Sequence, residues 1–491
     1  MLNALSPLRF STTNFTALGP QPERMTGCSG CYDYTTTEGR VNSMAVDPTT
    51  TVNGSIVAYL GSVGGGVWKT TNCCSNTTSW SVVTDDPLIS TTSIDSVTID
   101  PNDHNIIYAG TGDLNYGSFS MGSQGILKST DAGASWTVLG ADVFGMPFPT
   151  PPGQFPQYNA VGKVRVDPND SNKVAAGAKT GFYLSYDGGV SWTGPCSTDG
   201  FNTQRQDITG LELTDTGGGV TRILAAVGVR GFATTVQFDL GLNGANGIYN
   251  ATMGSSGCPT FTSIASNANG FVFGTAVSGS PYSTGAPMNA GSGTAFVDIN
   301  TGDQLGRLDI AVAPSNSNYI YVQAQSIVGN ASCGGAPGCQ IGAWASTNGG
   351  TSWTFMEGSQ GGALRDCGGG GGDYTQNWYD QGVAVDPNNP DRVFFDTFDV
   401  WFATRTGTAW NDTTCGYSYS GAAGPVHVDQ HALAFLPGSS SILLIGNDGG
   451  AHALEPAARF TPRPTNSSRL TYSRRRTALV GRRRPRMSAP S

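Results

Sequence analysis

Short apolar runs recur along the chain, and each is bounded by a turn rich in Asp, Pro, Gly or Asn. One kind of run ends in an Asp-Pro turn, as in "VNSMAVDP" (41–48), "IDSVTIDP" (94–101) and "VGKVRVDP" (161–168). A second run follows each turn, as in "IVAYLG" and "IIYAGTG", and a third, such as "GILK", comes before an octet that ends in tryptophan. Runs of this length between turn residues predict β-strands. Heptads and long amphipathic stretches, which would predict helices, are absent from the sequence.

The octet "STDAGASW" (129–136) recurs as "SYDGGVSW" (185–192) and "STNGGTSW" (346–353), and with an insertion at 70–80. One repeat therefore reads as a four-stranded antiparallel meander. A single meander cannot bury both of its faces, whereas radial packing of several meanders can. The first strand recurs seven times, around positions 44, 97, 164, 211, 310, 383 and 433. We predict an all-β, seven-bladed β-propeller of four-stranded antiparallel blades, with the last blade incomplete.

The propeller is expected over residues 41–450, as a single domain. Residues 1–40 form an N-terminal segment whose "NFTALGP" (14–20) is a candidate outer strand for closing the last blade. Residues 451–491 hold ten arginines and one acidic residue, without strand periodicity. Two interpretations of this tail stay open, a basic segment that binds polyanions and a disordered or frameshifted non-propeller sequence, of which we favour the second.

Composition narrows the classes of function. The net charge is −9, but residues 1–450 alone hold 16 basic and 34 acidic groups. Such a body repels nucleic acid and anionic membranes, and no apolar run is long enough to cross a bilayer. Ten cysteines favour disulfides in an extracellular or periplasmic protein, although no signal peptide is visible at the start of this chain. We expect a monomer without a cofactor; the pair Cys28 and Cys31 has no second CxxC to complete a metal site.

The octets themselves predict turns and not an active site. Their Asp or Asn side chain can accept backbone N–H bonds, their glycine permits a left-handed backbone, and their tryptophan anchors the strand by packing. The structural residues are Ser129, Asp131, Gly133, Trp136, Ser185, Asp187, Gly189, Trp192, Ser346, Asn348, Gly350 and Trp353.

The octet resembles the Asp-box, or BNR repeat, of sialidases, sortilin-type receptors, family 74 xyloglucan hydrolases and photosystem assembly factors. Locally, "GRVNSMAVDP", "GGGVWKTTN" and "VHVDQHALAF…GNDGG" resemble uncharacterised bacterial secreted proteins described as glycosyl hydrolases with BNR repeats. The resemblance implies a propeller over roughly 40–450, but no single chemistry, because these families share the fold alone. Family 74 enzymes carry a base aspartate in the first blade, where this chain has Val63. The sialidase Phe-Arg-Ile-Pro segment is absent, and only Arg40 and Arg307 could begin an arginine triad.

A channel mouth lined by long loops on one face is the expected site, because long loops on a rigid scaffold usually carry function. Aligned strand entrances place Arg40, Ser93, Ala160, Asp207, Gly306, Tyr379 and Asp429 at one level. Two positions on, they place Asn42, Asp95, Gly162, Thr209, Leu308, Gln381 and His431. We predict ligand binding by Arg40, Asp207, Tyr379 and His431, which suit a polar ligand such as a sugar. The alternative is that the channel mouth is polar because water fills it, and that its polar residues have no function.

Glycosidic hydrolysis needs two nearby carboxyl groups. The candidate pair is Asp113 with Asp448 or Asp429. No metal is expected, although His427, Asp429 and His431 alternate in "HVDQH" and would share one strand face.

Two functions remain. The first is a carbohydrate-directed, glycoside-hydrolase-like protein whose catalysis is unproven, and the second is a non-catalytic extracellular propeller that binds protein or peptide.

Overall fold

The computed structural model describes residues 39–454, together with two short strands before them. Outside the described residues lie 50–55, 75–77, 87, 90, 92, 116–120, 146, 149–156, 197–206, 229–246, 272–304, 327–339, 358–375, 407–409 and 415–425. The candidate strand at 14–20 and the tail beyond 454 also lie outside them.

Seven small antiparallel sheets of three or four strands form the blades of a β-propeller, which confirms the predicted fold class. Blade 1 comprises β3 (Val41–Val46), β4 (Ile56–Ser62), β5 (Gly66–Cys73) and β6 (Ser81–Val82). Blade 2 comprises β7 (Ile94–Ile99), β8 (Ile107–Thr111), β9 (Ile126–Ser129) and β10 (Thr137–Leu139). Blade 3 comprises β13 (Val161–Asp167), β14 (Asp170–Ala178) and β15 (Gly181–Ser185). Blade 4 comprises β16 (Asp207–Asp215), β17 (Thr221–Gly228), β18 (Gly247–Thr252) and β19 (Thr262–Ser263). Blade 5 comprises β20 (Leu305–Val312), β21 (Ile320–Ser326), β22 (Gln340–Ser346) and β23 (Thr354–Glu357). Blade 6 comprises β24 (Val383–Val385), β25 (Arg392–Asp396), β26 (Val400–Thr404) and β27 (Asn411–Asp412). Blade 7 comprises β28 (Gln430–Phe435), β29 (Leu443–Asn447) and β30 (Gly450–Leu454).

A few short elements lie outside the blades. They are β1 (Glu23–Met25) paired with β2 (Thr35–Thr37), β11 (Pro147–Phe148) paired with β12 (Gln157–Tyr158), the helix α1 (Ala141–Phe144) and the 3-10 turn η4 (Asn267–Asn269). No helix among the described residues is long and apolar enough to span a membrane.

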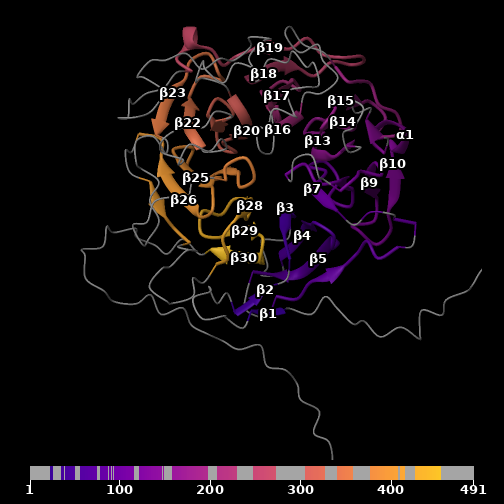
Figure 1. Ribbon diagram of the computed structural model, residues 1–491. Helices are drawn as coiled ribbons and strands as arrows, with labels where there is room; N and C mark the ends of the chain where they lie inside the picture. Colours follow the sequence, from indigo (N-terminus) through magenta and orange to yellow (C-terminus); the bar gives the residue numbers. More distant parts are fainter. Residues whose placement is uncertain are drawn as a thin grey trace, which may run out of the picture.

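The blades stand in a ring, with the first strand of each blade facing the centre and the later strands towards the rim (Figure 1). Apolar side chains pack between neighbouring blades, and each of the seven joints has its own buried cluster. The ring closes where Ile56 and Ala58 of blade 1 pack with Leu436 and Leu444 of blade 7. Because each blade buries its faces only against its neighbours, the whole ring is needed for one continuous core.

The three octets form the same hydrogen-bonded turn between third and fourth strands. In the first, Ser129 Oγ donates to Asp131 Oδ1 (2.7 Å) and accepts from Gly133 N (2.8 Å). Gly133 has a φ of 87°, which favours glycine. Trp136 reaches back to the preceding blade, where its Nε1 donates to Val83 O (2.9 Å). The octets at 185 and 346 repeat the serine and Asp/Asn bonds.

Two blades have three strands in the described part of the chain. In blade 3 the segment after the octet keeps one isolated bridge, Leu184 to Thr193, in place of the fourth strand expected there. In blade 7 the third strand is β30, so the propeller runs four residues beyond the boundary expected at 450. Ala453 packs into the cluster between blades 7 and 1, which gives this stretch an apolar contact despite its weak sequence pattern.

Two disulfides are formed among the described cysteines. Cys196 of blade 3 is bonded to Cys258 of blade 4, and Cys73 is bonded to its neighbour Cys74. The expected CxxC pair at Cys28 and Cys31 lies outside the described residues.

Candidate functional site

β-Bulges at the start of the first strands shape the channel mouth. The strand-one to strand-two register shifts between Val41 and Ser43, between Ile94 and Ser96, and between Gln430 and Ala432. A bulge leaves one residue without a pairing partner and re-aims its side chain. Asn42, Asp95 and His431 are these residues in blades 1, 2 and 7, and Asn42 Nδ2 donates to Asp95 Oδ1 across the joint (2.7 Å).

In blade 5 the register shift lies nearer the start of the strand, between Leu305 and Leu308. The sequence alignment placed Leu308 at the channel level, and this is wrong: Leu308 is fully buried in the core between blades 4 and 5. Arg307 takes its place, and its guanidinium donates to the carbonyl oxygens of Tyr379 (2.5 Å) and Gln381 (3.0 Å) in blade 6.

A chain of hydrogen bonds joins five of the predicted site residues, which come from blades 1, 2, 6 and 7. Arg40 makes an ion pair with Asp113, and its Nη1 donates to Tyr379 Oη (2.8 Å). Asp448 Oδ1 accepts two bonds, from Tyr379 Oη and from His431 Nε2, each 2.8 Å long. The rings of Tyr379 and His431 meet edge to face, 4.5 Å between centroids. We call these five residues the mouth cluster.

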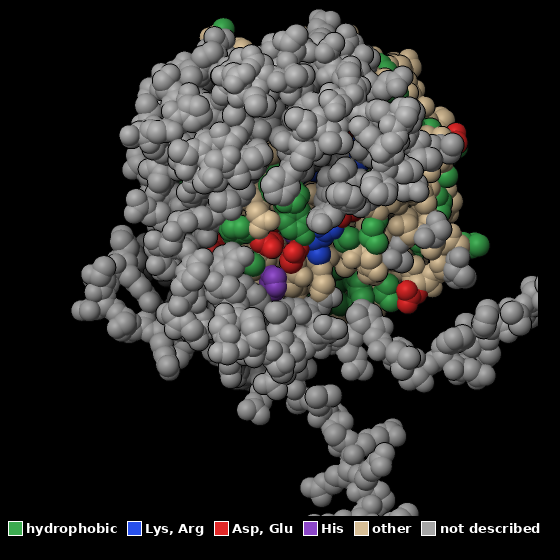
Figure 2. Space-filling model, viewed as in Figure 1, with side chains coloured by type: hydrophobic (Ala, Val, Ile, Leu, Met, Phe, Trp, Pro, Cys, Tyr) green, Lys and Arg blue, Asp and Glu red, His purple; other side chains and the backbone are tan. Residues whose placement is uncertain are grey.

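Figure 2 shows acidic side chains, a basic side chain and a histidine gathered at the central opening of this face. Within the mouth cluster, Asp113 is 4% exposed and Asp448 is 29% exposed. Asp113 is therefore a buried partner of Arg40, whereas the Asp448 carboxylate is open to a ligand. Asp207, also predicted to bind ligand, begins β16 of blade 4, on a blade that contributes nothing to the mouth cluster.

Two further aspartates, Asp380 and Asp429, adjoin the mouth cluster. Asp448 N donates to Asp429 O (3.2 Å), and Asp380 Oδ1 lies 4.0 Å from His431 Nδ1. Asp380 is fully buried, and neither of its carboxyl oxygens accepts an N–H or O–H bond from the described residues. Sequence reasoning did not select Asp380, because it follows Tyr379 in a segment without strand pattern.

The carboxyl groups of this site are held in opposite protonation states. Burial, and then the charge of Asp448, raise the pKa of Asp429 to about 7. Burial raises the pKa of Asp380 well above its usual value, and the charges of Asp429 and Asp448 add to this. Burial would also raise the pKa of Asp448, but the hydrogen bonds from His431 and Tyr379 outweigh it and lower that pKa. A carboxyl group with a raised pKa and a carboxylate with a lowered pKa in one site can serve as acid and base in catalysis.

His431 is the neutral member of the site. Burial lowers its pKa, against the opposing effect of its hydrogen bond to Asp448. Since an ionised carboxylate can only accept a hydrogen bond, Nε2 of His431 carries the ring proton and donates the hydrogen bond to Asp448.

The strand expected over His427–His431 does not form. β28 begins at Gln430, and Asp429 has a φ of 64°. The left-handed backbone breaks the period-two alternation on which the metal hypothesis rested, and Nδ1 of His427 is instead bonded to Val428 O (2.8 Å). No group of three or more His, Cys, Asp or Glu side chains in the described part of the chain has an arrangement suited to a metal ion.

No family model matches this chain. A xyloglucanase of Hypocrea jecorina is 30% identical over 149 residues, which are 26% of this chain and 17% of that protein. A GH74 enzyme of Niastella koreensis has a similar structure with a TM-score of 0.50 and 17% identity, over 85% of this chain and 52% of that one. The GH74 xyloglucanase of Xanthomonas campestris has a TM-score of 0.49 and 16% identity, over 84% of this chain and 52% of that one. YCF48 bound to D1 peptide has a TM-score of 0.41 and 11% identity, over 85% of this chain and 91% of that one. The chain thus spans about half the length of the GH74 structures, and at these identities the likeness shows the fold alone.

Proposed function

We propose that this propeller acts on a neutral polysaccharide at the channel mouth and hydrolyses its glycosidic bonds with Asp429 and Asp448. The observation that carries the proposal is the neighbouring pair of carboxyl groups whose pKa values are shifted in opposite directions. Glycoside hydrolysis uses such a pair, one group as acid and one as carboxylate.

The roles follow from the protonation states. Asp429, with a pKa of about 7, is protonated in mildly acidic solution and donates its proton to the leaving glycosidic oxygen. Asp448 stays ionised, because His431 and Tyr379 donate to its Oδ1, and takes a proton from the attacking water. The water hydroxyl adds to the anomeric carbon as the bond to the leaving oxygen breaks.

The sugar is held by the polar groups around this pair. Arg40 is 12% exposed and charged and Asp448 is 29% exposed, so both present polar groups that can bind sugar hydroxyls. The name of the xyloglucanase relative supports xyloglucan as the substrate class. The disulfide between Cys196 and Cys258 supports export to an oxidising compartment.

The experiment is a polysaccharide panel assayed with the wild type, Asp429→Asn, Asp448→Asn and the matched control Asp215→Asn, at the exposed end of β16. We expect each of the first two to lose at least about 100-fold in kcat, while the control on blade 4 keeps its activity. Hydrolysis that survives both substitutions would refute the assignment. Val63, at the place of the family 74 base, favours the second candidate, a non-catalytic protein- or peptide-binding propeller. That candidate is supported if no glycan is cleaved by the wild type.

A further inference from the structure

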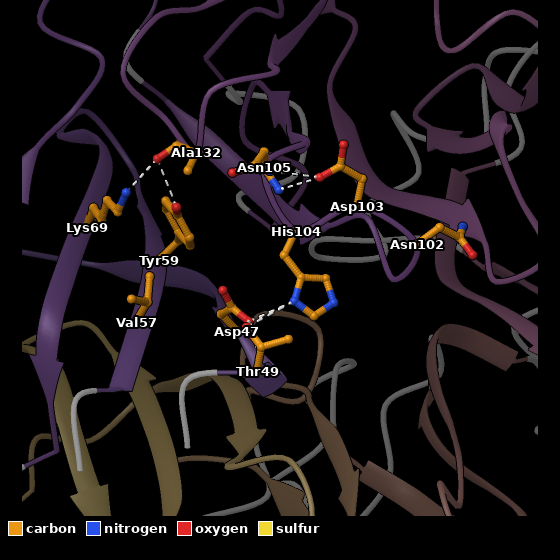
Figure 3. A pocket seen from close by; sticks show the side chains of 10 residues that line it. All are labelled: Asp47, Thr49, Val57, Tyr59, Lys69, Asn102, Asp103, His104, Asn105 and Ala132. Carbon is orange, nitrogen blue, oxygen red and sulfur yellow. Dashed lines mark hydrogen bonds and ion pairs between the residues drawn. The ribbon is translucent and has the colours of Figure 1, made fainter. Parts of the chain in front are cut away.

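A cleft opens between blades 1 and 2, at the end of the first strands opposite the mouth cluster. Its volume is about 450 Å³, within the range of ~300 to 1,000 Å³ common for small-molecule sites. The walls come from the turn after β3, the turn between β7 and β8, and strands β4 and β5 (Figure 3). Asp47, Lys69, Asp103 and His104 supply its charged and titratable groups.

The frame of this cleft is a repeated structural joint. Tyr59 Oη and Lys69 Nζ both donate to Ala132 O, at 2.9 and 2.6 Å. One blade further on, Tyr108 and Lys128 donate in the same way to Gly188 O, at 3.0 and 2.8 Å. These contacts therefore hold neighbouring blades together and are no sign of a ligand.

What differs is the residue that bridges the joint. An asparagine two positions after the aspartate of the Asp-Pro turn reaches the next blade at three other joints. The bonds run from Asn102 to Asp167 O, from Asn169 to Thr221 Oγ1 and from Asn388 to Gly438 O, each 2.9 Å long. Blade 1 has Thr49 at this position, and its shorter side chain bonds back to Asp47 Oδ1 (2.7 Å). In place of the bridging amide, His104 of blade 2 reaches this turn, with its Nδ1 2.8 Å from Asp47 Oδ1.

A second residue that departs from the repeat also lines the cleft. His104 stands where the equivalent turn of blade 3 has Ser171. Its Nδ1 lies 2.8 Å from Asp47 Oδ1, so the ring is oriented by the carboxylate of the neighbouring blade. In the described part of the chain Nε2 of His104 has no hydrogen-bond partner, and in Figure 3 it points away from Asp47. At the next joint, where serine stands in this place, Asn102 makes the connection instead, with its Nδ2 donating to Asp167 O (2.9 Å).

We propose that this cleft is a second binding site, for a neutral mono- or oligosaccharide, that is separate from the channel mouth. Its wall offers donors, from the Lys69 ammonium and the His104 ring, next to acceptors, from the Asp103 and Asp47 carboxylates. Alternating donors and acceptors match the vicinal hydroxyl groups of a sugar. Two carboxylates against one ammonium disfavour an anion such as phosphate.

The test follows saccharide binding through the histidine rings. The chain has only four histidines, so ring NMR signals can be assigned by substitution. Glucose, xylose, cellotetraose and inorganic phosphate are each titrated into the wild-type protein. We expect a saccharide to shift the His104 signals in a saturable way, and phosphate to leave them in place. No saturable shift with any of the three sugars, or a shift with phosphate alone, would overturn the proposal.

Two substitutions that copy the protein's own repeat keep the fold intact. Thr49→Asn supplies the bridging amide used at three other joints, and we expect it to abolish binding with no loss of thermal stability. His104→Ser copies blade 3 and should weaken binding about tenfold, the effect of one lost hydrogen bond. Asp448→Asn, which removes the carboxylate proposed for catalysis, should leave binding in the cleft unchanged. Unaltered binding in Thr49→Asn would refute the site, whatever the outcome of the activity assays.

Discussion

Asp429 gives the sharpest test of the electrostatics of the channel mouth. Its folded-state pKa of about 7 compares with the usual 3.8. Since each pKa unit corresponds to about 1.4 kcal/mol, ionising this buried carboxyl costs the folded state about 4 kcal/mol. The raised pKa means that stability is complete below about pH 4 and is lost as the pH rises to about 7.

Asp429→Asn removes this penalty. Asparagine has the shape of a protonated aspartate, and it tolerates the left-handed φ of 64° found at this position. We expect the variant and the wild type to unfold at similar urea concentrations at pH 4. At pH 8 the variant should be more stable by about 4 kcal/mol, although it is catalytically inactive.

Urea unfolding at pH 4, 6 and 8, followed by tryptophan fluorescence, measures the difference. A stability difference for Asp429→Asn that is the same at pH 4 and pH 8 would refute the reasoning, because the penalty exists only where the carboxyl is ionised in the unfolded chain.

Three other substitutions test separate parts of the structure. Ser129→Ala leaves the buried N–H of Gly133 without an acceptor and should cost about 1 to 3 kcal/mol in urea unfolding; a cost below about 0.5 kcal/mol would contradict the role of the octet. Arg40→Met removes the cation that pairs with the buried Asp113 carboxylate and should cost about 3 to 5 kcal/mol, most of which should be recovered when Asp113→Asn is added. Cys196→Ser opens a disulfide that spans 62 residues and should cost about 4 kcal/mol; wild-type protein treated with a reductant should lose a similar amount in the same assay.

The candidate site was largely predictable because it is built on a repeat. Arg40, Asp113, Tyr379, His431 and Asp448 were selected from equivalent positions of the blades, and the structure joins them in one hydrogen-bonded cluster. Repeat alignment works here because equivalent strand entrances meet at one channel.

The alignment failed where the bulge lies at a different position of the strand. In blade 5 the register shift between Leu305 and Leu308 puts Arg307 and not Leu308 at the channel, and a single-residue shift reverses which face of a strand a side chain occupies. Asp207 occupies an equivalent strand entrance, but its blade lies away from the four blades that supply the mouth cluster.

The sequence by itself determined the number of blades and the octet turns. These features depend on apolar periodicity and on side chains that bond within a few residues of their own turn. The tertiary structure alone decided which carboxyl groups share the channel mouth and how each is protonated. Burial and the approach of charges from blades far apart in the chain set those pKa values, and neither is visible until the ring has closed.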